Sequence, residues 1–393
     1  MSGCVAVLNA GSSSIKFAIY DAAEGEPLEF HGKIEGIGAA PKLEASDANG
    51  REVARHSWTE LDHTAATGEV LRVARDLIAG RPVLAVGHRV VRGGVRFDAP
   101  VRIDAGVIAA LRALIPLAPL HQPHNIAPIE AIAAAAPNIP QVACFDTAFH
   151  RGQPPLAQMF ALPREYADAG VRRYGFHGLS YEYVSGRLAE IAPALAVGRV
   201  VIAHLGNGAN LCALTGGRSQ ATTMGFTALD GLVMGTRCGL IDPGVLLHLM
   251  DAFGLGAREI EDLLYHRSGL LGVSGVSSDM RALRASPEPA AAAAIALFVY
   301  RIVREIGSMA AALGGIDGLV FTGGIGEHDA ATRAEIAAGC AWLGLELDPA
   351  RNAGGGPLIS RDGSKLAAWV IPTDEERIIA RDARAVVAVE PAT

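Results

Sequence analysis

VAVLNAGSSSIKFAIYD, residues 5–21, places a glycine and three serines between two apolar runs, with Lys16 directly behind them. The segments 5–10 and 15–21 are predicted to be strands, the second because apolar and polar positions alternate. A small, hydroxyl-rich turn between two strands is either an ordinary hairpin or a cradle whose backbone N–H groups face a phosphate. In a cradle, the lysine supplies the opposing positive charge.

A similar pattern returns in the second half of the chain. Residues 200–217, VVIAHLGNGANLCALTGG, pass from an apolar strand through a glycine- and amide-rich turn into another apolar strand. Aligning the two segments places Gly206 beside Gly11 and Asn207 beside Ser12. Two strand–turn–strand candidates in two halves predict duplicated domains that each offer a phosphate loop to a shared nucleotide cleft.

A third glycine-rich segment strengthens this interpretation. DGLVFTGGIGEH, residues 317–328, is a buried strand that leads into a glycine-rich turn. The helix expected over 331–341 would present its N-terminus to an anion. The chain has neither a GxxxxGK[ST] loop nor a GxGxxG fingerprint, which excludes the Walker and Rossmann classes of nucleotide site.

The rest of the chain alternates strands and helices. We expect strands over 82–91 and 140–149, helices over 63–79, 105–114 and 126–135, and a surface loop over 38–52. Strands separated by helices predict an α/β fold. The apolar run 290–300 is too short to span a bilayer and predicts a buried helix.

Composition limits the possible classes of function. A chain of 393 residues is too long for one typical core, which predicts two domains. A net charge of −7 and a pI near 6.0 give no electrostatic footprint for nucleic acid. We therefore expect neither a nucleic-acid nor a membrane partner.

The cysteines and the N-terminus indicate the cellular compartment. No basic segment followed by an apolar stretch opens the chain, so we expect no signal peptide. The cysteines are scattered, odd in number and never in a CxxC motif, which argues against disulfides and a zinc site. Both observations predict a cytoplasmic protein. The five cysteines are Cys4, Cys144, Cys212, Cys238 and Cys340.

Several charged residues occupy positions suited to chemistry. Arg89 ends a predicted buried strand and Arg237 lies between glycines, so the two could clamp an oxyanion or form ordinary salt bridges. Asp146 ends another predicted strand, and His177 is flanked by glycines. Glu375 either ends a strand, where it could hold Mg²⁺ through water, or opens a helix.

The ordered set of motifs resembles the acetate kinases of the acetate/propionate kinase family, essentially from end to end. The motifs are NAGSSSIK, GHRVV, APLHQP, FDTAFH, YGFHG, HLGNG, MGFTALDGLVMGTR, GVSGVSSD, FTGGIGEH and IPTDEE. The resemblance implies two actin-like, ribonuclease H-like domains, over 1–147 plus 377–393 and over 148–376, the second carrying the nucleotide-binding and dimerisation elements. It also implies a homodimer.

The resemblance further implies a reaction and its site. The reaction is reversible, direct in-line transfer of the ATP γ-phosphoryl group to acetate, giving acetyl phosphate and ADP, with Mg²⁺ or Mn²⁺ held by Asn9 and Glu375. The implied catalytic residues are Asp146, Arg89, Arg237 and His177. The implied acyl-site residues are Arg89, Val91, Leu120, His121, Phe176 and Ala228. The implied nucleotide-binding residues are Ser12, Ser14, Lys16, His204, Leu205, Gly206, Asn207, Gly208, Asp279, Met280, Arg281, Gly324, Ile325, Gly326, Glu327 and His328.

Four residues depart from the family pattern. Ala228 stands where members usually have proline, which would leave more room beside the methyl end of acetate. Arg92 replaces a usual histidine, and Leu179 and Tyr181 alter the residues that follow YGFH. We expect these last three to neighbour the site rather than to belong to it.

Particular residues distinguish this function from its alternatives. A carboxylate acceptor is already ionised near neutral pH, so we expect Asp146 to orient an arginine or a metal-bound water rather than to remove a proton. A propionate or broader short-chain acyl kinase is the alternative; butyrate kinase fits the APLHQP segment less well. The arginine pair argues against a chaperone-like ATPase or a degenerate binding module. The small residues Gly324 and Ile325 favour ATP over pyrophosphate.

Overall fold

The computed structural model describes residues 3–11, 13–23, 25–118 and 121–389. Ser12 and Leu120, both expected to contact a ligand, lie outside the described residues. The chain forms two compact units: unit 1 comprises Met1–Phe149 and Asp374–Thr393, and unit 2 comprises His150–Thr373. The predicted boundaries, after residues 147 and 376, lie within three residues of these divisions.

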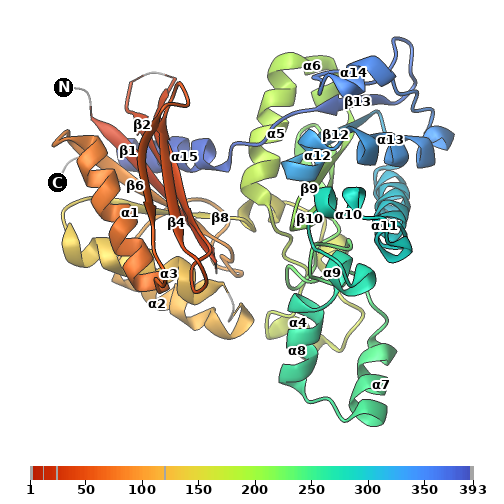
Figure 1. Cartoon of the computed structure of the whole chain (residues 1–393), viewed down its shortest axis with the longest axis horizontal. Coiled ribbons are helices and arrows are strands. Elements are labelled where there is room, and N and C mark those ends of the chain that lie inside the picture. Colours follow the sequence, from red (N-terminus) through yellow and green to blue (C-terminus); the bar gives the residue numbers. More distant parts are fainter. Residues whose placement is uncertain (1–2, 12, 24, 119–120, 390–393) are drawn as a thin grey trace. The chain divides into compact units, whose positions relative to one another are not determined.

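Unit 1 contains an eight-stranded sheet in the order β5-β4-β3-β2-β1-β6-β8-β7 (Figure 1). Neighbours from β1 to β5 run antiparallel, whereas β1, β6 and β8 run parallel to one another. The strands are β1 (Cys4–Ala10), β2 (Ser14–Asp21), β3 (Leu28–Glu35), β4 (Lys42–Asp47), β5 (Glu52–Ser57), β6 (Val83–Val90), β7 (Val101–Arg102) and β8 (Gln141–Phe145).

The opening stretch forms the hairpin predicted for it. β1 and β2 pair with Asn9 opposite Lys16, and the Gly11 backbone N–H donates to the Ser14 carbonyl at 2.8 Å. The surface loop predicted over 38–52 is wrong, because β4 lies within it. Leu43 and Ala45 are buried, whereas Lys42 and Glu44 are exposed, so this strand alternates with the period of two typical of a half-buried strand.

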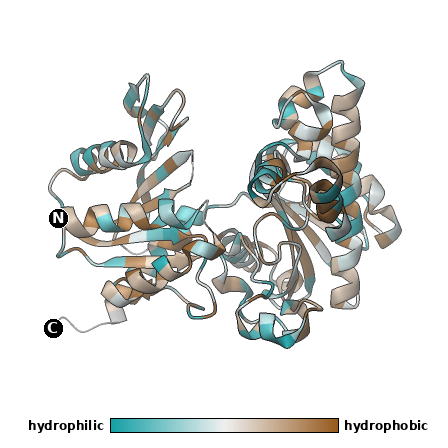
Figure 2. Cartoon of the chain, turned by 90° about the horizontal axis from the view of Figure 1, so that it is seen from below, coloured by the Kyte–Doolittle hydropathy of each residue, from teal (hydrophilic) through white to brown (hydrophobic). Residues whose placement is uncertain are grey.

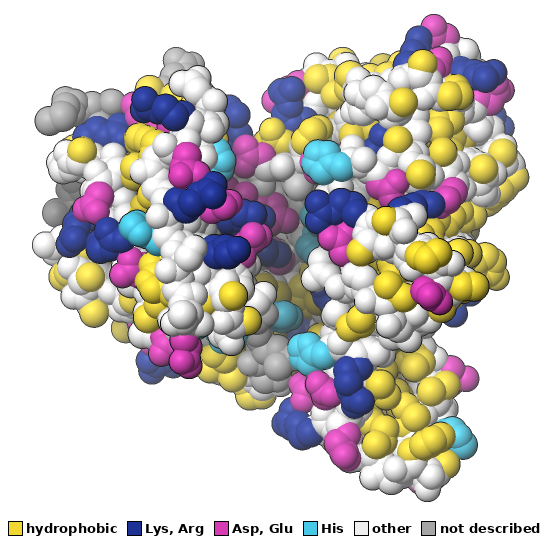
Figure 3. Space-filling model, in the orientation of Figure 1, with side chains coloured by type: hydrophobic (Ala, Val, Ile, Leu, Met, Phe, Trp, Pro, Cys, Tyr) yellow, Lys and Arg dark blue, Asp and Glu magenta, His cyan; other side chains and the backbone are white. Residues whose placement is uncertain are grey.

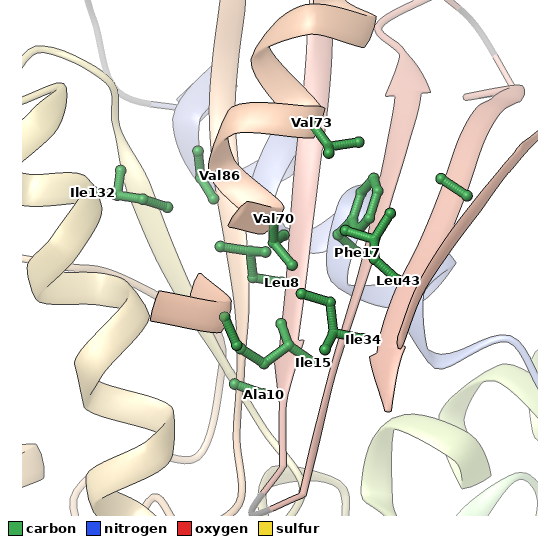
Figure 4. Close-up of a cluster of buried hydrophobic side chains, with 12 residues drawn as sticks. Leu8, Ala10, Ile15, Phe17, Ile34, Leu43, Val70, Val73, Val86 and Ile132 are labelled. Atoms are coloured by element: carbon green, nitrogen blue, oxygen red, sulfur yellow. The ribbon is translucent and has the colours of Figure 1, made fainter. Parts of the chain in front are cut away.

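Helices cover both faces of the unit 1 sheet. α1 (His63–Ile78) and α3 (Gln122–Ala135) pack on one face, where Val70 and Ile132 join Leu8 and Val86 in one apolar core (Figure 4). Adjacent strand residues point to opposite faces, so Gly87, next to Val86, faces the other side. There a Cβ on Gly87 would lie 2.5 Å from Ile379 of α15 (Glu375–Val389).

Unit 2 repeats the central topology of unit 1 in a five-stranded sheet, β11-β10-β9-β12-β13. In both units three consecutive antiparallel strands are followed by two strands parallel to the first of them, β6 and β8 in unit 1 and β12 and β13 in unit 2. The predicted duplication is therefore present. The strands are β9 (Arg199–Leu205), β10 (Ala209–Thr215), β11 (Arg218–Thr222), β12 (Gly318–Thr322) and β13 (Ala367–Val370).

The longest helix, α11 (Pro289–Leu313), packs against β10 and contains the predicted buried helix. Among the described residues, no helix combines the length and apolar character needed to cross a membrane. Figure 2 shows hydrophobic residues along the strands of both units. The remaining helices are α2 (Ala105–Ala113), α4 (Arg164–Asp168), α5 (Gly178–Ile191), α6 (Pro193–Ala196), α7 (Pro243–Phe253), α8 (Ala257–His266), α9 (Gly269–Ser274), α10 (Met280–Ala285), α12 (Gly323–His328), α13 (Ala330–Gly339) and α14 (Pro349–Ala353), and the short 3₁₀ turns are Ile115–Leu117, Ala148–His150, Pro155–Gln158 and Ala341–Leu343.

Two local predictions near the site need correction. The glycine-rich turn predicted after β12 is the helix α12, in which the backbone N–H of the first residue, Gly323, donates to the side chain of Glu327 in the same helix. Glu375 does not end a strand but opens α15, the alternative considered for it. Acidic residues are favourable there because the helix N-terminus carries partial positive charge.

Candidate active site

In unit 1 the predicted site residues gather where parallel strands end. Asn9 lies near the end of β1, Arg89 near the end of β6, and Asp146 directly after β8. The carboxyl ends of adjacent parallel strands meet at one edge of a sheet, the usual place for a ligand site in α/β folds. Arg89 Nε donates to Asp146 Oδ1 at 2.9 Å, and Arg89 Nη2 donates to Oδ2 at 2.7 Å.

Two glutamates at the start of α15 complete this cluster. Glu375 Oε2 lies 3.7 Å from Arg89 Nη1, which also donates to Asn9 Oδ1 at 3.2 Å. The amide Nδ2 of Asn9 donates to Glu376 Oε1 at 2.9 Å. Glu376 was not among the predicted site residues, although its place beside Glu375, on the first turn of a possible helix, was a usable signal.

The electrostatics of the cluster follow from its burial. Burial raises the pKa of Asp146, which is 1% exposed, and the facing Arg89 guanidinium opposes that shift. Burial works against the charge of Arg89, but the carboxylates of Asp146 and Glu375 outweigh it and raise the pKa of the guanidinium. Arg89 is therefore a permanent cation with a fixed orientation.

The residues expected to hold magnesium fit that ion. Mg²⁺ prefers oxygen ligands and usually keeps several waters, with one or two carboxylates and substrate phosphates completing the shell. Asn9 Oδ1 and Glu375 Oε2 both lie close to Arg89 Nη1, so the cluster offers two oxygen ligands near the same point. No cluster of three or more His, Cys, Asp or Glu able to hold a metal occurs among the described residues.

Lys16 lies on the hairpin strand β2, directly opposite Asn9. Its side chain is exposed and makes no hydrogen bond or ion pair with other described residues. It lines a pocket of about 500 Å³ together with Tyr20, Asp374 and Glu376. The ammonium group is thus available to a ligand of this unit. Ser14, at the start of β2, uses its carbonyl to close the hairpin.

In unit 2, Arg237 and His177 flank the backbone of Gly208. A Cβ built on Gly208 would lie 2.8 Å from Arg237 Nη2 and 3.3 Å from His177 Nε2. Arg237 Nη1 donates to the Ala228 carbonyl at 2.6 Å, and within the described residues no carboxylate pairs with this guanidinium. Burial lowers the pKa of Arg237. In contrast to Arg89, its charge is uncompensated.

His177 is held in an unusual conformation. Its φ of 58° is left-handed, and it precedes the first residue of α5. Its ring stacks on that of His204 with centroids 4.3 Å apart, and Ser180 Oγ lies 2.8 Å from His204 Nδ1. The neighbouring Phe176 carbonyl accepts from the Asn210 amide at 3.1 Å. The stacked pair of histidines is therefore fixed by β9, β10 and α5.

A pocket of about 1020 Å³ in unit 2 brings together much of the expected nucleotide site. Its volume suits a nucleotide-sized ligand. The expected residues that line it are Gly206, Asn207, Asp279, Met280, Arg281, Gly324, Ile325 and His328. His204, Leu205, Gly208, Gly326 and Glu327 do not line this pocket, and Leu205 is fully buried.

Four residues that line this pocket were not predicted from the sequence: Ser278, Arg284, Ala285 and Asp329. Arg284 lies three residues after Arg281 on α10, on the same helix face, so helical spacing could have revealed it. Its Nη1 lies 2.6 Å from Glu335 Oε1, and its Nε lies 3.5 Å from Asp329 Oδ2.

The residues expected to shape the acyl site are divided between the units. Val91 and His121 belong to unit 1, whereas Phe176 and Ala228 belong to unit 2. The Val91 backbone N–H donates to Asn125 Oδ1 at 2.9 Å, and Phe176 is 3% exposed. Both residues are therefore rigidly placed.

The three neighbouring departures are all buried. Arg92 is fully buried and donates to the Leu117 carbonyl at 2.5 Å. Leu179 and Tyr181 lie on the first turn of α5, where the Tyr181 ring meets that of His150 edge-on at 5.6 Å. These side chains support the elements that carry the expected site residues.

Residues 4–381 match the model of the Acetokinase family. The chain belongs to this family. Among its relatives, an acetate kinase of Rhodopseudomonas palustris is 55% identical over 389 residues, which cover 97% of this chain and 98% of that protein. The crystal structure of Porphyromonas gingivalis acetate kinase covers 98% of this chain and 100% of its own, with a TM-score of 0.87 and 40% identity.

A propionate kinase from Francisella tularensis is also similar, with a TM-score of 0.91, 36% identity and coverage of 98% of this chain and 100% of that one. Curated family members at 50–55% identity are named acetate kinases, which favours acetate over propionate. Family membership confirms the predicted phosphotransferase activity and the α/β fold with duplicated actin-like domains.

Proposed function

We propose that this chain reversibly transfers the γ-phosphoryl group of ATP to acetate, giving acetyl phosphate and ADP by direct in-line transfer. The observation that carries the proposal is Arg237, a half-buried guanidinium beside His177 that has no carboxylate partner among the described residues. An arginine in this state presents a planar fork to a carboxylate or a phosphoryl group.

The charges of the expected site residues suit phosphoryl transfer. This reaction spreads negative charge over the equatorial oxygens and asks the protein mainly to align the groups and neutralise that charge. Arg89 and Arg237 hold the carboxylate and the transferring group, and His177 donates to the equatorial oxygens. Lys16 would contact the nucleotide phosphates.

Asp146 acts as a positioning residue. Acetate is already ionised near neutral pH and needs no general base to become a nucleophile. Both carboxylate oxygens of Asp146 are occupied by the Arg89 fork, at 2.9 and 2.7 Å. This arrangement supports a role in orienting Arg89.

Mg²⁺, or Mn²⁺ in its place, would supply further neutralisation of phosphate charge when bound. Asn9 Oδ1 and Glu375 would hold it, together with water. The hydrogen bond from Asn9 Nδ2 to Glu376 fixes the amide so that Oδ1 points to the other side. Glu376 is thus a positioning residue for Asn9.

The nucleotide would occupy the pocket in unit 2. Gly206 and Asn207 approach its phosphates, with His204, Leu205 and Gly208 supporting that loop. Gly324 and Ile325 leave room for adenosine, because a Cβ on Gly324 would meet nothing within 4 Å. Asp279 and Arg281, which also line this pocket, form a bidentate ion pair in which Arg281 Nη2 donates to Asp279 Oδ2 at 2.7 Å.

The acyl site would comprise Val91, Leu120, His121, Phe176 and Ala228. The Ala228 carbonyl accepts from Arg237, so the Ala228 methyl group lies near the anion-binding guanidinium. A methyl group in place of a proline ring enlarges this site, and we expect propionate to be a secondary substrate.

We also propose that the enzyme is a cytoplasmic homodimer. The helix α7 has no buried residue although it is rich in apolar ones, and Leu247 and Phe253 are 62% and 67% exposed. Figure 3 shows hydrophobic side chains gathered over α7 at the lower edge of unit 2. Contiguous exposed apolar surface is typical of an association face. None of the five cysteines is in a disulfide, which suits a reducing compartment.

The test is to trap acyl phosphate as the hydroxamate, with Mg-ATP and acetate, propionate or butyrate in parallel. Turnover that is highest with acetate and falls with chain length supports the proposal. The matched variant Ala228→Pro should lower propionate turnover more than acetate turnover. ATP hydrolysis without acyl phosphate from any acid would overturn it.

A further inference from the structure

Residues Thr373–Glu376, which we call the connecting segment, lead the chain from unit 2 into unit 1. On the unit 1 side, Asp374 caps α15 by accepting the Arg377 backbone N–H at 3.0 Å. The next two residues, Glu375 and Glu376, contact Arg89 and Asn9 as described above. The placement of the metal-binding glutamate therefore depends on how this short segment is held.

On the unit 2 side, the segment is held by Glu327. Its Oε1 accepts from the backbone N–H of Thr373 at 3.1 Å and from that of Gly323 at 2.8 Å. The Thr322 hydroxyl donates to the same oxygen at 3.3 Å. One carboxylate oxygen thus joins the first turn of α12 to the connecting segment.

Glu327 also differs from its neighbours on α12 because its side chain does not line the nucleotide pocket. Ile325 and His328 line the nucleotide pocket, whereas Glu327 does not, and its side chain is only 13% exposed. A carboxylate whose oxygen already accepts three hydrogen bonds from protein donors, away from the pocket, is poorly suited to contact an anionic nucleotide.

Thr373 connects the segment to the histidine pair as well. Its hydroxyl donates to Ser180 Oγ at 2.8 Å, and Ser180 Oγ lies 2.8 Å from His204 Nδ1. His204 in turn stacks on His177. Thr373 therefore connects three parts of the structure: it hydrogen-bonds to Glu327 of α12, it reaches the histidine pair through Ser180, and it lies two positions before α15.

We propose that Glu327 is a positioning residue that locks the connecting segment to the nucleotide-binding helix α12, and so sets Glu375 for metal binding when nucleotide is bound. The inference rests on the proposed function and replaces the nucleotide contact expected for Glu327. Nucleotide held at Gly324 and Ile325 would stabilise the first turn of α12, and the Glu327 carboxylate would pass that order to Thr373.

The test compares Glu327→Ala with Glu327→Gln. In the alanine variant we expect kcat for acetyl phosphate formation to fall by about tenfold or more, because a small misplacement of a catalytic group is costly. The Mg²⁺ concentration for half-maximal activity should rise. The Kd for ADP, measured by calorimetry without magnesium, should stay within about twofold of that of the unaltered enzyme. Glutamine keeps an acceptor oxygen and should restore most of kcat.

Two further variants serve as controls. His328→Ala alters a pocket-lining residue on the same helix and should raise the ADP Kd with a smaller effect on kcat. Glu346→Ala removes an exposed carboxylate of unit 2 and should change neither. If Glu327→Ala fails to fold, Glu327→Asp decides the question, since it keeps the negative charge but shortens the side chain that reaches the Thr373 backbone N–H; it should lower kcat and leave the ADP Kd unchanged.

A raised ADP Kd with unchanged kcat and magnesium dependence in Glu327→Ala would overturn the inference and make Glu327 a nucleotide ligand. If Glu327→Asp is the deciding variant, an unchanged kcat overturns the inference too. Absence of acyl phosphate formation by the unaltered protein would instead overturn the proposed function, and the ADP measurement would still separate the two roles of Glu327.

Discussion

Arg89 and Asp146 form a bidentate ion pair in which each carboxylate oxygen accepts one N–H of the guanidinium fork. The aspartate is 1% exposed, so water does not compete for it. This pair fixes the plane of the guanidinium and leaves Nη1 directed at Asn9 and Glu375. The orientation of the cation is thus determined before any ligand arrives.

Asp146→Asn should lower kcat by about 100-fold or more, because the buried Arg89 loses its charge partner and its fixed orientation. The measurement is steady-state kinetics over a broad pH range, with the magnesium dependence recorded at each pH. A positioning role predicts that the variant also needs more Mg²⁺. A general base would instead show as an ionisation that disappears from the pH–rate profile while acetate and Mg²⁺ binding stay intact.

Arg237→Lys should reduce kcat/KM for acetate by roughly 100-fold, because an ammonium group cannot donate to the Ala228 carbonyl and present a planar fork to the substrate together. Initial rates at varied acetate and fixed Mg-ATP give this value. The matched variant Arg218→Lys, at an exposed position of β11, should behave as the unaltered enzyme. If Arg237→Lys has the same kcat/KM for acetate as the unaltered enzyme, a positive charge at this position is sufficient and the planar fork is not required.

Stability should fall in acid as two buried histidines are forced to ionise. Burial lowers the pKa of His88 and of His150 to about 4, from an ordinary value of 6.5. Between these values the unfolded chain binds more protons, so the folded state loses stability as pH falls from 6.5 towards 4, by up to about 1.4 kcal/mol per pH unit for each histidine. Urea unfolding at several pH values between 4 and 6.5 gives the dependence of the free energy of unfolding on pH. His88→Gln should show a shallower slope, and an identical slope would contradict the assignment.

Phe253→Glu should shift the protein from dimer to monomer, because a charge would be buried in the apolar association face proposed on α7. Light scattering after size-exclusion chromatography measures the mass in solution. Glu261→Lys on the neighbouring helix α8 alters charge without adding it to α7, and should remain dimeric. A monomeric unaltered protein would disprove the proposed face.

Local patterns in the sequence were sufficient for the strands that carry the site. The hairpin at residues 5–21 and its counterpart at residues 200–217 were visible because apolar runs flank small turn residues. β4 was missed because it has only two inward-facing apolar residues, Leu43 and Ala45, and a single pair of this kind is a weak periodic signal. The turn predicted at α12 failed because glycine disfavours a helix, whereas the capping carboxylate of Glu327 compensates there.

The contacts that orient the site could not be read in this way. That Arg89 meets Asp146, 57 positions later, follows from the parallel pairing of β6 with β8, which is a property of the assembled sheet. The roles of Glu376 and Thr373 depend on side-chain directions at the start of α15. Ordered motifs indicated which residues matter, but only packing reveals which of them hold others in place.

The last helix, α15, packs against β6 at Gly87, so unit 1 is built from both ends of the chain. During synthesis the first 149 residues therefore leave the ribosome without the helix that covers one face of their sheet. Unit 2, which is continuous in sequence, is complete first, and unit 1 is finished only when α15 emerges. A product that stops before α15 would leave that sheet face exposed to solvent, so we expect it to be prone to aggregation and degradation.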